Sequence, residues 1–236
     1  MSSRTSPAPA TPKLHNVSRG SLAALLTMSV LILSGSRRAA SAAGTDDAPA
    51  NSTLVCHETF DQPLDKKWHV NTGDWQVQEG ALVAREKAAD QHAAAARRVL
   101  ETGNAVYELN FQLQEGAKAF HFGFDPKRGT LNKKGHLFSV IITPQSWKIL
   151  KHVDKARPKD DPNETLATQK RTFATGQWYR LRVTTWGPYV TAKIDDGTAL
   201  KASHPSFTVR KPTLVFRCAG AGVEVDDLRV WTQNGQ

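Results

Sequence analysis

The sequence lacks the motifs of several well-known kinds of site. It has no cysteine and histidine spacing typical of zinc, no glycine-rich phosphate loop and no serine, histidine and aspartate pattern. It also shows no internal repeat and no convincing helix. These absences argue against zinc-binding domains, nucleotide-binding loops and serine hydrolases. Cysteine itself is scarce, since Cys56 and Cys218 are the only two.

The chain also lacks an apolar run long enough to span a bilayer comfortably, which takes about 20 residues. Its main apolar run, residues 21–33, follows basic residues and precedes small residues at 39–43. This layout is typical of a secretory signal peptide, so we predict one over residues 1–43 and a secreted or periplasmic protein. Arg37 and Arg38 fit this layout poorly. An uncleaved signal anchor that tethers the protein to a membrane is the alternative.

The leader accounts for much of the positive charge. It contains five basic residues and no acidic one, so its removal lowers the formal net charge from +9 to +4. The remaining chain has no strong basic excess, and we expect no nucleic-acid partner and, after cleavage, no membrane contact. Residues 44–53 are predicted to be a flexible linker, and residues 54–233 a single domain large enough to bury a core.

The two ends of the domain share a pattern. Residues 56–61 and 73–83, and residues 215–231 at the far end, alternate apolar and polar side chains, and each end contains one cysteine. We therefore predict that the first and last strands lie side by side, joined by a disulfide between Cys56 and Cys218. Such a bridge would stabilise the fold by roughly 4–5 kcal/mol in the chain-entropy model. Two buried free thiols are the alternative.

Period-two alternation continues through the rest of the domain and predicts an all-β sandwich or barrel. Residues 88–100 are expected to form either a helix or an alanine-rich loop, and residues 151–172 either a long exposed loop or an extended hairpin. The predicted strands lie around residues 75–82, 105–113, 119–125, 136–142, 146–152, 178–185, 189–194, 213–218 and 223–231.

Three of these segments resemble a known family. Phe60-Asp61 and Trp68 precede a Gly-Asp-Trp-x-Val-x-x-Gly-x-Leu motif at residues 73–82, and residues 177–197 form a tryptophan, strand, turn, strand, Asp-Gly pattern. With the closing segment 225–230, they resemble concanavalin A-like jelly rolls. The nearest branch is the bacterial 3-keto-disaccharide hydrolase domain, with laminin G-like and family-sixteen glucanase-like domains as cousins. The resemblance covers about residues 56–231 and implies a two-sheet antiparallel jelly-roll sandwich.

The sequence departs from these relatives where chemistry is concerned. The Glu-x-Asp-x-x-Glu strand of family-sixteen glucanases is absent, and Glu224-Val-Asp226 on the closing strand is the nearest approach. The keto-disaccharide hydrolase motifs expected at mid-chain are also replaced, by residues 119–124 and 136–142. The resemblance therefore implies a scaffold, and catalytic residues are not transferred with it.

Polar residues on two central strands form the first candidate site. If the strands of Glu108 and His121 are neighbours, a trough would hold Glu108, Asn110, His121 and Asp125, joined by His136 and by Arg180 or Arg182. Such a set could perform acid–base chemistry or bind a divalent metal. Cleavage of a 3-keto-disaccharide would need a base for the proton at C2 and a cation near the ketone. The best candidates are Glu108, His121, Asp125 and His136. A plain solvated sheet face is the alternative.

Aromatic residues and a group of acids suggest two further sites. Trp147, Trp186 and Tyr189 are candidates for stacking on sugars, with Asn110 and Arg180 as polar partners. The other tryptophans are expected in the core. The acids could hold a structural calcium ion, with hydrogen bonding to turn amides as the alternative. The core tryptophans are Trp68, Trp75, Trp178 and Trp231, and the acids are Asp61, Asp226 and Asp227.

Three hypotheses about function remain at this point. The first is an exported module that binds a glycan or small saccharide. The second is a 3-keto-glycoside hydrolase or lyase, and the third is a scaffold domain without a small ligand. No cofactor is required by the sequence, although a divalent metal would suit the second hypothesis.

Overall fold

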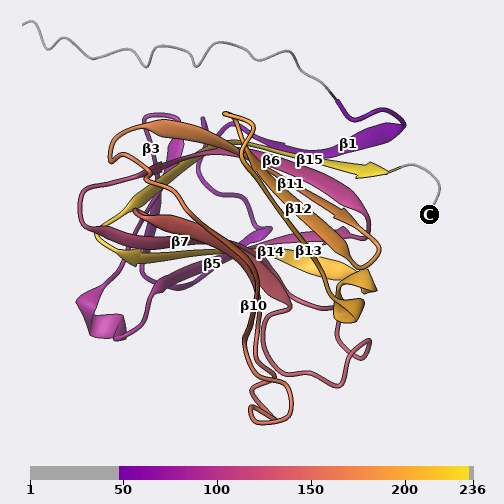
Figure 1. The fold of residues 1–236 in the computed structure, drawn as a ribbon. Helices are drawn as coiled ribbons and strands as arrows, with labels where there is room; N and C mark the ends of the chain where they lie inside the picture. The colour runs from indigo at the N-terminus through magenta and orange to yellow at the C-terminus, as the bar shows by residue number, and fades with distance from the viewer. Residues whose placement is uncertain (1–47, 234–236) are drawn as a thin grey trace, which may run out of the picture. The chain divides into compact units, whose positions relative to one another are not determined.

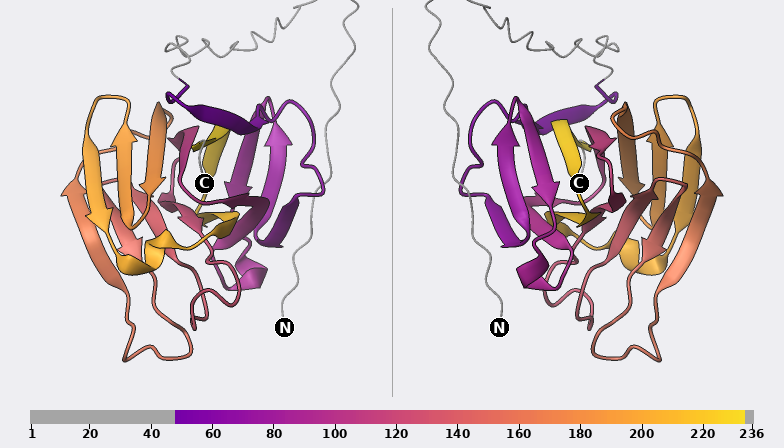
Figure 2. Two further views of the ribbon diagram at one scale, coloured as in Figure 1. Left: turned by 90° about the vertical axis from the view of Figure 1, so that its right-hand side faces the viewer. Right: turned by 90° about the vertical axis from the view of Figure 1, so that its left-hand side faces the viewer.

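The computed structural model describes residues 48–233, which form two antiparallel β-sheets packed face to face (Figure 1). Figure 2 shows the two layers from opposite sides. The predicted signal peptide lies outside the described residues. The first sheet contains β1 (Ser52–Glu58), β3 (Asp74–Gln78), β4 (Ala81–Arg85), β6 (Ala105–Leu113), β11 (Trp178–Trp186), β12 (Tyr189–Ile194), β13 (Ala199–Ser203) and β15 (Val223–Gln233).

The second sheet has seven strands in the order β10-β9-β8-β7-β14-β5-β2. Two short 3₁₀ turns, η1 (Ala88–Asp90) and η2 (Pro205–Thr208), lie in the connections. The strands of this sheet are β2 (Trp68–Thr72), β5 (Ala94–Thr102), β7 (Ala117–Phe124), β8 (Phe138–Thr143), β9 (Ser146–Lys151), β10 (Glu164–Lys170) and β14 (Lys211–Gly220). The all-β jelly-roll sandwich expected from the sequence is confirmed.

The core lies between the two sheets and is rich in aromatic rings. Alternate residues of β6 and β7 face each other across it, and the rings of Tyr107 and Phe122 are 5.9 Å apart, while those of Phe111 and Phe120 are 5.7 Å apart. All four side chains are almost completely buried. Because side chains of a strand alternate between its two faces, the remaining residues of β6 and β7 must point away from the core, in opposite directions.

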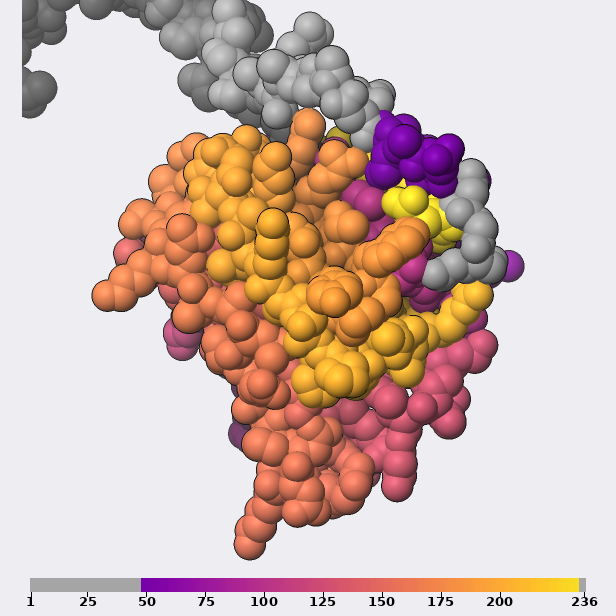
Figure 3. Space-filling view, turned by 45° about the vertical axis from the view of Figure 1, so that its right-hand side comes forward, coloured from indigo at the N-terminus to yellow at the C-terminus, as the bar shows by residue number. Residues whose placement is uncertain are grey.

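The structure decides between the alternatives for two segments that the sequence left open. Residues 88–100 form neither a helix nor a loop along their length, because η1 is followed by β5 from Ala94. Alternation places Ala94 and Ala96 in the core, and pairing with β2 and β14 overrides the helical preference of alanine. Residues 151–172 form an extended hairpin, in which β9 and β10 pair around a loop at 152–163. This loop projects from the body of the sandwich (Figure 3).

The first and last strands pair as predicted, with Cys56 opposite Val230. The predicted disulfide is nevertheless wrong, since both cysteines are buried free thiols. Cys218 belongs to β14 in the other sheet and is paired with Ala94 of β5, whereas Cys56 is next to Arg98. Four residues of a strand span about 13 Å, and a disulfide needs Cα atoms closer than about 7 Å.

The structure contains no helix, within residues 48–233, that is both long and apolar enough to cross a membrane. Strand β1 begins at Ser52 and so includes the last two residues of the predicted linker.

Candidate functional site: a cationic face on the seven-stranded sheet

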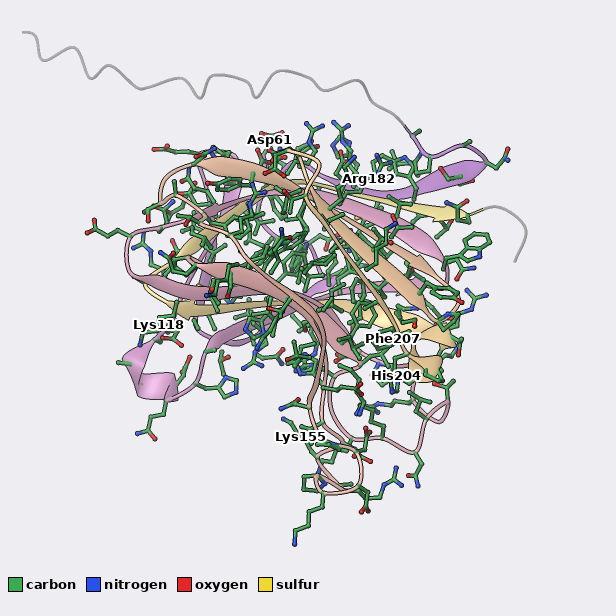
Figure 4. The ribbon with its side chains drawn as sticks, viewed as in Figure 1. Asp61, Lys118, Lys155, Arg182, His204 and Phe207 are labelled. Atoms are coloured by element: carbon green, nitrogen blue, oxygen red, sulfur yellow. The ribbon has the colours of Figure 1, made fainter. Side chains whose placement is uncertain are left out.

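The predicted trough does not form, because its residues belong to different sheets. Glu108 and Asn110 lie on β6 of the eight-stranded sheet, whereas His121 lies on β7 of the seven-stranded sheet and Asp125 directly follows it. The two strands were expected to be neighbours, but they face each other across the core. Their polar side chains therefore point to opposite outer faces of the sandwich. Figure 4 shows the two sides, with Arg182 on the upper face and Lys155 below the lower sheet.

Glu108 lies among arginines on the outer face of the eight-stranded sheet. Arg182 and Arg229 are its cross-strand partners, and the guanidinium of Arg182 lies 3.8 Å from its carboxylate. Arg180 approaches the same carboxylate to 3.9 Å and is paired with Asn110 across the strands. Alternating charges of this kind stabilise neighbouring strands. These residues therefore form cross-strand ion pairs on the outer face of their sheet, away from His121 and Asp125.

Two of the acids considered for calcium have other partners. Asp227 Oδ1 lies 2.9 Å from Nε2 of His57 and accepts a hydrogen bond from Arg229 Nε, also at 2.9 Å. Asp226 accepts from the backbone N–H of Asp227 within β15, where the register shifts, and not in a turn. Asp61 is exposed. Over the described part of the chain, no group of three or more His, Cys, Asp or Glu side chains could hold a metal ion.

The outer face of the seven-stranded sheet is different in character. Asp125 is its central acid, and its Oδ1 lies 2.6 Å from Nδ1 of His136. Its Oδ2 accepts hydrogen bonds from Arg97 Nε and from Thr213 Oγ1, both at 2.9 Å. Arg97 also donates to the side chain of Asn71 on β2. Residues from four separate parts of the chain are thus connected through one carboxylate.

Further histidines extend this network toward β9. The rings of His136 and His152 are 5.3 Å apart, and His152 Nε2 lies 2.7 Å from the hydroxyl of Ser139. Gly123 lies opposite Ser139 in the neighbouring strand, and a Cβ atom at this glycine would meet the serine hydroxyl at 2.3 Å. Glycine inside a strand often marks a close approach of this kind. Here it leaves space for the contact between Ser139 and His152.

Burial and neighbouring charges set the ionisation of this face. Burial, followed by the charge of Arg217, lowers the pKa of His121 to about 4. Burial, followed by the charges of His136 and His121, lowers the pKa of His152 to about 3. Burial alone would raise the pKa of Asp125, but hydrogen bonds and charge from His136 and Arg97 outweigh it and hold that pKa at about 2. At pH 7, His121 and His152 are therefore neutral, and Asp125 is ionised.

Two adjoining hollows open onto this face and share Arg97, His136 and Lys155 as lining residues. The first has a volume of about 410 Å³ and the second about 600 Å³. We call this surface the cationic face. The first hollow also includes Asn71, Thr72, His92, Ala95, His152, Val153, Asn163 and Arg217, and the second Asp125, Lys127, Arg128, Lys133, Lys134 and Thr213, among others.

The aromatic candidates do not lie on the cationic face. Trp147 is fully buried in the core, so the prediction of an exposed stacking residue is wrong there. Trp186 and Tyr189 are 55% and 61% exposed, at the turn between β11 and β12 of the eight-stranded sheet. Trp178 is only half-buried, on the outer face of that sheet. Of the other three expected core tryptophans, Trp68 and Trp75 lie in the core as predicted, whereas Trp231 is buried outside it.

Sequence reasoning missed three residues of the cationic face. Arg97 lay in a segment that was expected to be helix or loop, and Arg217 follows the core residue Phe216 in a strand that was identified. Alternation along β14 would have placed Arg217 on the outer face. His152 ended a predicted strand, and alternation from the core residues Trp147 and Ile149 would have placed it on the outer face as well.

The two antiparallel sheets and their strand order define a concanavalin A-like jelly-roll sandwich. Comparison with models of protein families gives no match, and comparison with curated protein sequences gives none either. Similar solved structures do exist. SCLam, a non-specific endo-β-1,3(4)-glucanase of family GH16, superposes with a TM-score of 0.60 at 15% identity, covering 79% of this chain and 93% of that one.

Two further structures show the same likeness. The laminarinase from Rhodothermus marinus gives a TM-score of 0.59 at 13% identity, over 78% of this chain and 98% of that one. A variant of SCLam crystallised with a glucan oligosaccharide, which has a cellobiosyl-glucose at its active site, gives 0.60 at 14% identity, over 78% and 96% of the two chains. At these identities, the likeness concerns the fold.

Proposed function

We propose that this protein binds saccharides on the cationic face of its seven-stranded sheet. The observation that carries the proposal is the pair of adjoining hollows, of about 410 and 600 Å³, lined by polar side chains on a jelly-roll scaffold. Hollows of this size suit small ligands when a few polar groups fix the orientation of the ligand. The fold likeness to saccharide-degrading enzymes, one of them with an oligosaccharide bound, supports this choice of ligand.

Recognition would depend on hydrogen bonds more than on stacking. No Trp, Tyr or Phe lines either hollow within the described residues. The hollows instead present amide, imidazole and guanidinium groups. Asn71 and Asn163 are far apart in the sequence but line the same hollow. Such groups match the hydroxyls of a sugar ring.

Glycan affinity electrophoresis of the full chain, with a panel of neutral and acidic polysaccharides, tests this proposal. The double variant Asn71→Ala, Asn163→Ala should weaken binding by roughly 10-fold, as expected for two neutral hydrogen bonds. The matched control is Trp186→Ala, Tyr189→Ala on the other sheet, which should bind like the unmodified chain. Binding lost only in this control would place the site at the β11–β12 turn and contradict the proposal.

A second candidate function rests on the pairing of His136 with Asp125. A carboxylate next to Nδ1 orients an imidazole and stabilises its protonated form, which is the arrangement of a general base. With a 3-keto-glycoside, His136 would take the proton from C2, and the glycosidic bond at C1 would break by elimination as the imidazolium gives that proton to the leaving oxygen. Water would then add to the double bond, with its hydroxyl bonded to C1 and its proton to C2. Asp125 would hold the imidazolium, and Arg97 or Lys155 would face the developing enediolate oxygen.

Release of free 3-keto-sugar from a 3-keto-disaccharide tests this second function. Release above the buffer rate that falls by about 100-fold or more in His136→Gln, but not in Trp186→Ala, would establish it. Equal rates in protein and buffer would refute it and leave saccharide binding. If neither binding nor release is found, the scaffold hypothesis from the sequence gains.

A further inference from the structure

The cationic face has far more positive than negative charge. Its first hollow is lined by Arg97, Lys155 and Arg217 and by no acid. In the second hollow, Asp125 is the only acid among several lysines and arginines. That carboxylate already accepts from Arg97, His136 and Thr213, so it cannot neutralise the remaining cations. The imbalance is local, because residues 44–236 together have a formal net charge of only +4.

Some of the cations on this face have acidic partners at its rim. Lys127 pairs with Glu101 at 3.1 Å, and Lys133 with Asp161 at 2.9 Å. Among the ion pairs of residues 48–233, none involves Arg128, Lys134, Lys155 or Arg217. Lys155, which borders both hollows, is labelled below the lower sheet in Figure 4.

Arg217 is the most informative of these cations. Its cross-strand neighbours are Ala95 and His121, neither of which is an acid. Its guanidinium is partly buried, and its Nε has no hydrogen-bond partner. Burial, followed by repulsion from Arg97 in the same hollow, lowers the pKa of Arg217. A partly buried cation without a counter-charge is unfavourable unless a ligand supplies one.

We propose that the cationic face binds an acidic saccharide and places its carboxylate or sulfate group between Arg97, Arg217 and Lys155. This proposal rests on the saccharide binding proposed above and names the class of saccharide. Guanidinium groups bind carboxylate and sulfate-like oxygens with paired hydrogen bonds. The neutral imidazole of His152, which lines the first hollow, can donate an N–H group without adding a charge of its own.

The hollows favour a saccharide over a nucleic acid. Binding of single strands usually combines positive charge with aromatic stacking, and no Trp, Tyr or Phe lines the hollows within the described residues. A nucleic acid is therefore an outcome of the test that would contradict the proposal.

Calorimetric titration of the full chain provides the test, with three trisaccharide probes and one oligonucleotide. The probes are trigalacturonate, a sulfated trisaccharide and neutral laminaritriose, and the oligonucleotide is a short single-stranded DNA. We expect one or both acidic probes to bind at least 10-fold more tightly than laminaritriose, and this preference to shrink as salt is raised. Which acidic probe binds more tightly separates carboxylate from sulfate as the recognised group.

Variants of Arg217 make the test specific. Arg217→Gln should weaken binding of the acidic probe by about 10-fold to 100-fold, the range for a hydrogen bond to a charged group, and leave laminaritriose unchanged. Arg217→Lys should retain part of the affinity. Lys201→Gln, an exposed lysine of β13 on the other sheet, is the matched control and should have no effect. Because Arg217 has no counter-charge, Arg217→Gln should also raise the melting temperature of the free protein.

The outcomes separate the two proposals. If acidic and neutral probes bind equally and Arg217→Gln changes neither, the acidic class is wrong, while saccharide binding stands. If no saccharide binds, both proposals fail. If the oligonucleotide binds as tightly as the acidic probe, the face recognises charge alone, and the proposal is overturned.

Discussion

Replacement of Asp125 by Asn tests the charge network at the centre of the cationic face. The pKa of Asp125 is about 2 in the folded protein, against an ordinary value of 3.8. This difference corresponds to about 2.5 kcal/mol of stability at pH 7, at about 1.4 kcal/mol for each pKa unit. Since the folded pKa is the lower one, the contribution is present above pH 3.8 and is lost as the pH falls toward 2. About half of it should remain at pH 3.

Urea unfolding of the full chain and of Asp125→Asn, at pH 7 and at pH 3, measures this contribution. Asparagine keeps the shape and one acceptor but removes the charge, so we expect a loss of about 2 kcal/mol at pH 7 and about 1 kcal/mol at pH 3. Glu108→Gln is the matched control, because that carboxylate contacts its arginines only at 3.8–3.9 Å, whereas Asp125 accepts hydrogen bonds at 2.6–2.9 Å. A loss that does not change with pH, or no loss at pH 7, would refute the reasoning.

Three further predictions concern packing and thiols. Gly123→Ala should destabilise the fold by about 1–3 kcal/mol in urea unfolding, since its Cβ would overlap the hydroxyl beneath it; unchanged stability would contradict the geometry. By the same assay, Trp147→Ala should lower the free energy of unfolding by about 3–5 kcal/mol and Trp186→Ala by less than about 0.5 kcal/mol, because only Trp147 is buried. Equal losses in the two variants would contradict this placement. Neither cysteine should react with a thiol reagent in the folded protein, because both thiols are buried and burial raises the pKa of Cys218 to about 12. Both should react once the protein is unfolded. A two-proton mass difference on reduction would instead reveal a disulfide.

Much of the fold could be predicted because alternation is a local signal. The segments around residues 105–113 and 119–125 alternate cleanly, and the structure places their apolar members in the core. The pairing of the two ends was also predicted correctly. The strand at Ala94–Thr102 was missed because its alanines favour a helix locally, and only pairing with two neighbouring strands makes it extended.

The site could be predicted only in part, since alternation does not tell which strands share a sheet. Glu108 and His121 were expected on neighbouring strands, but the chain crosses from one sheet to the other between β6 and β7. His121, Asp125 and His136 do lie on one face, as expected. Arg217 joins them because its strand β14 pairs with β7, and Arg97 joins them because β5 pairs with the other edge of β14. Strand β14 comes about 90 residues later than β7 in the sequence, so this pairing leaves no local signal.

The most direct test of saccharide binding on the cationic face is to locate a bound saccharide by NMR, using the histidine ring resonances of the full chain. On addition of an acidic oligosaccharide, we expect the resonances of His121, His136 and His152 to shift with one saturating affinity. His57, on the opposite sheet, should stay unchanged. Shifts confined to His57, or to the ring signals of Trp186 and Tyr189, would contradict the placement of the site on the cationic face.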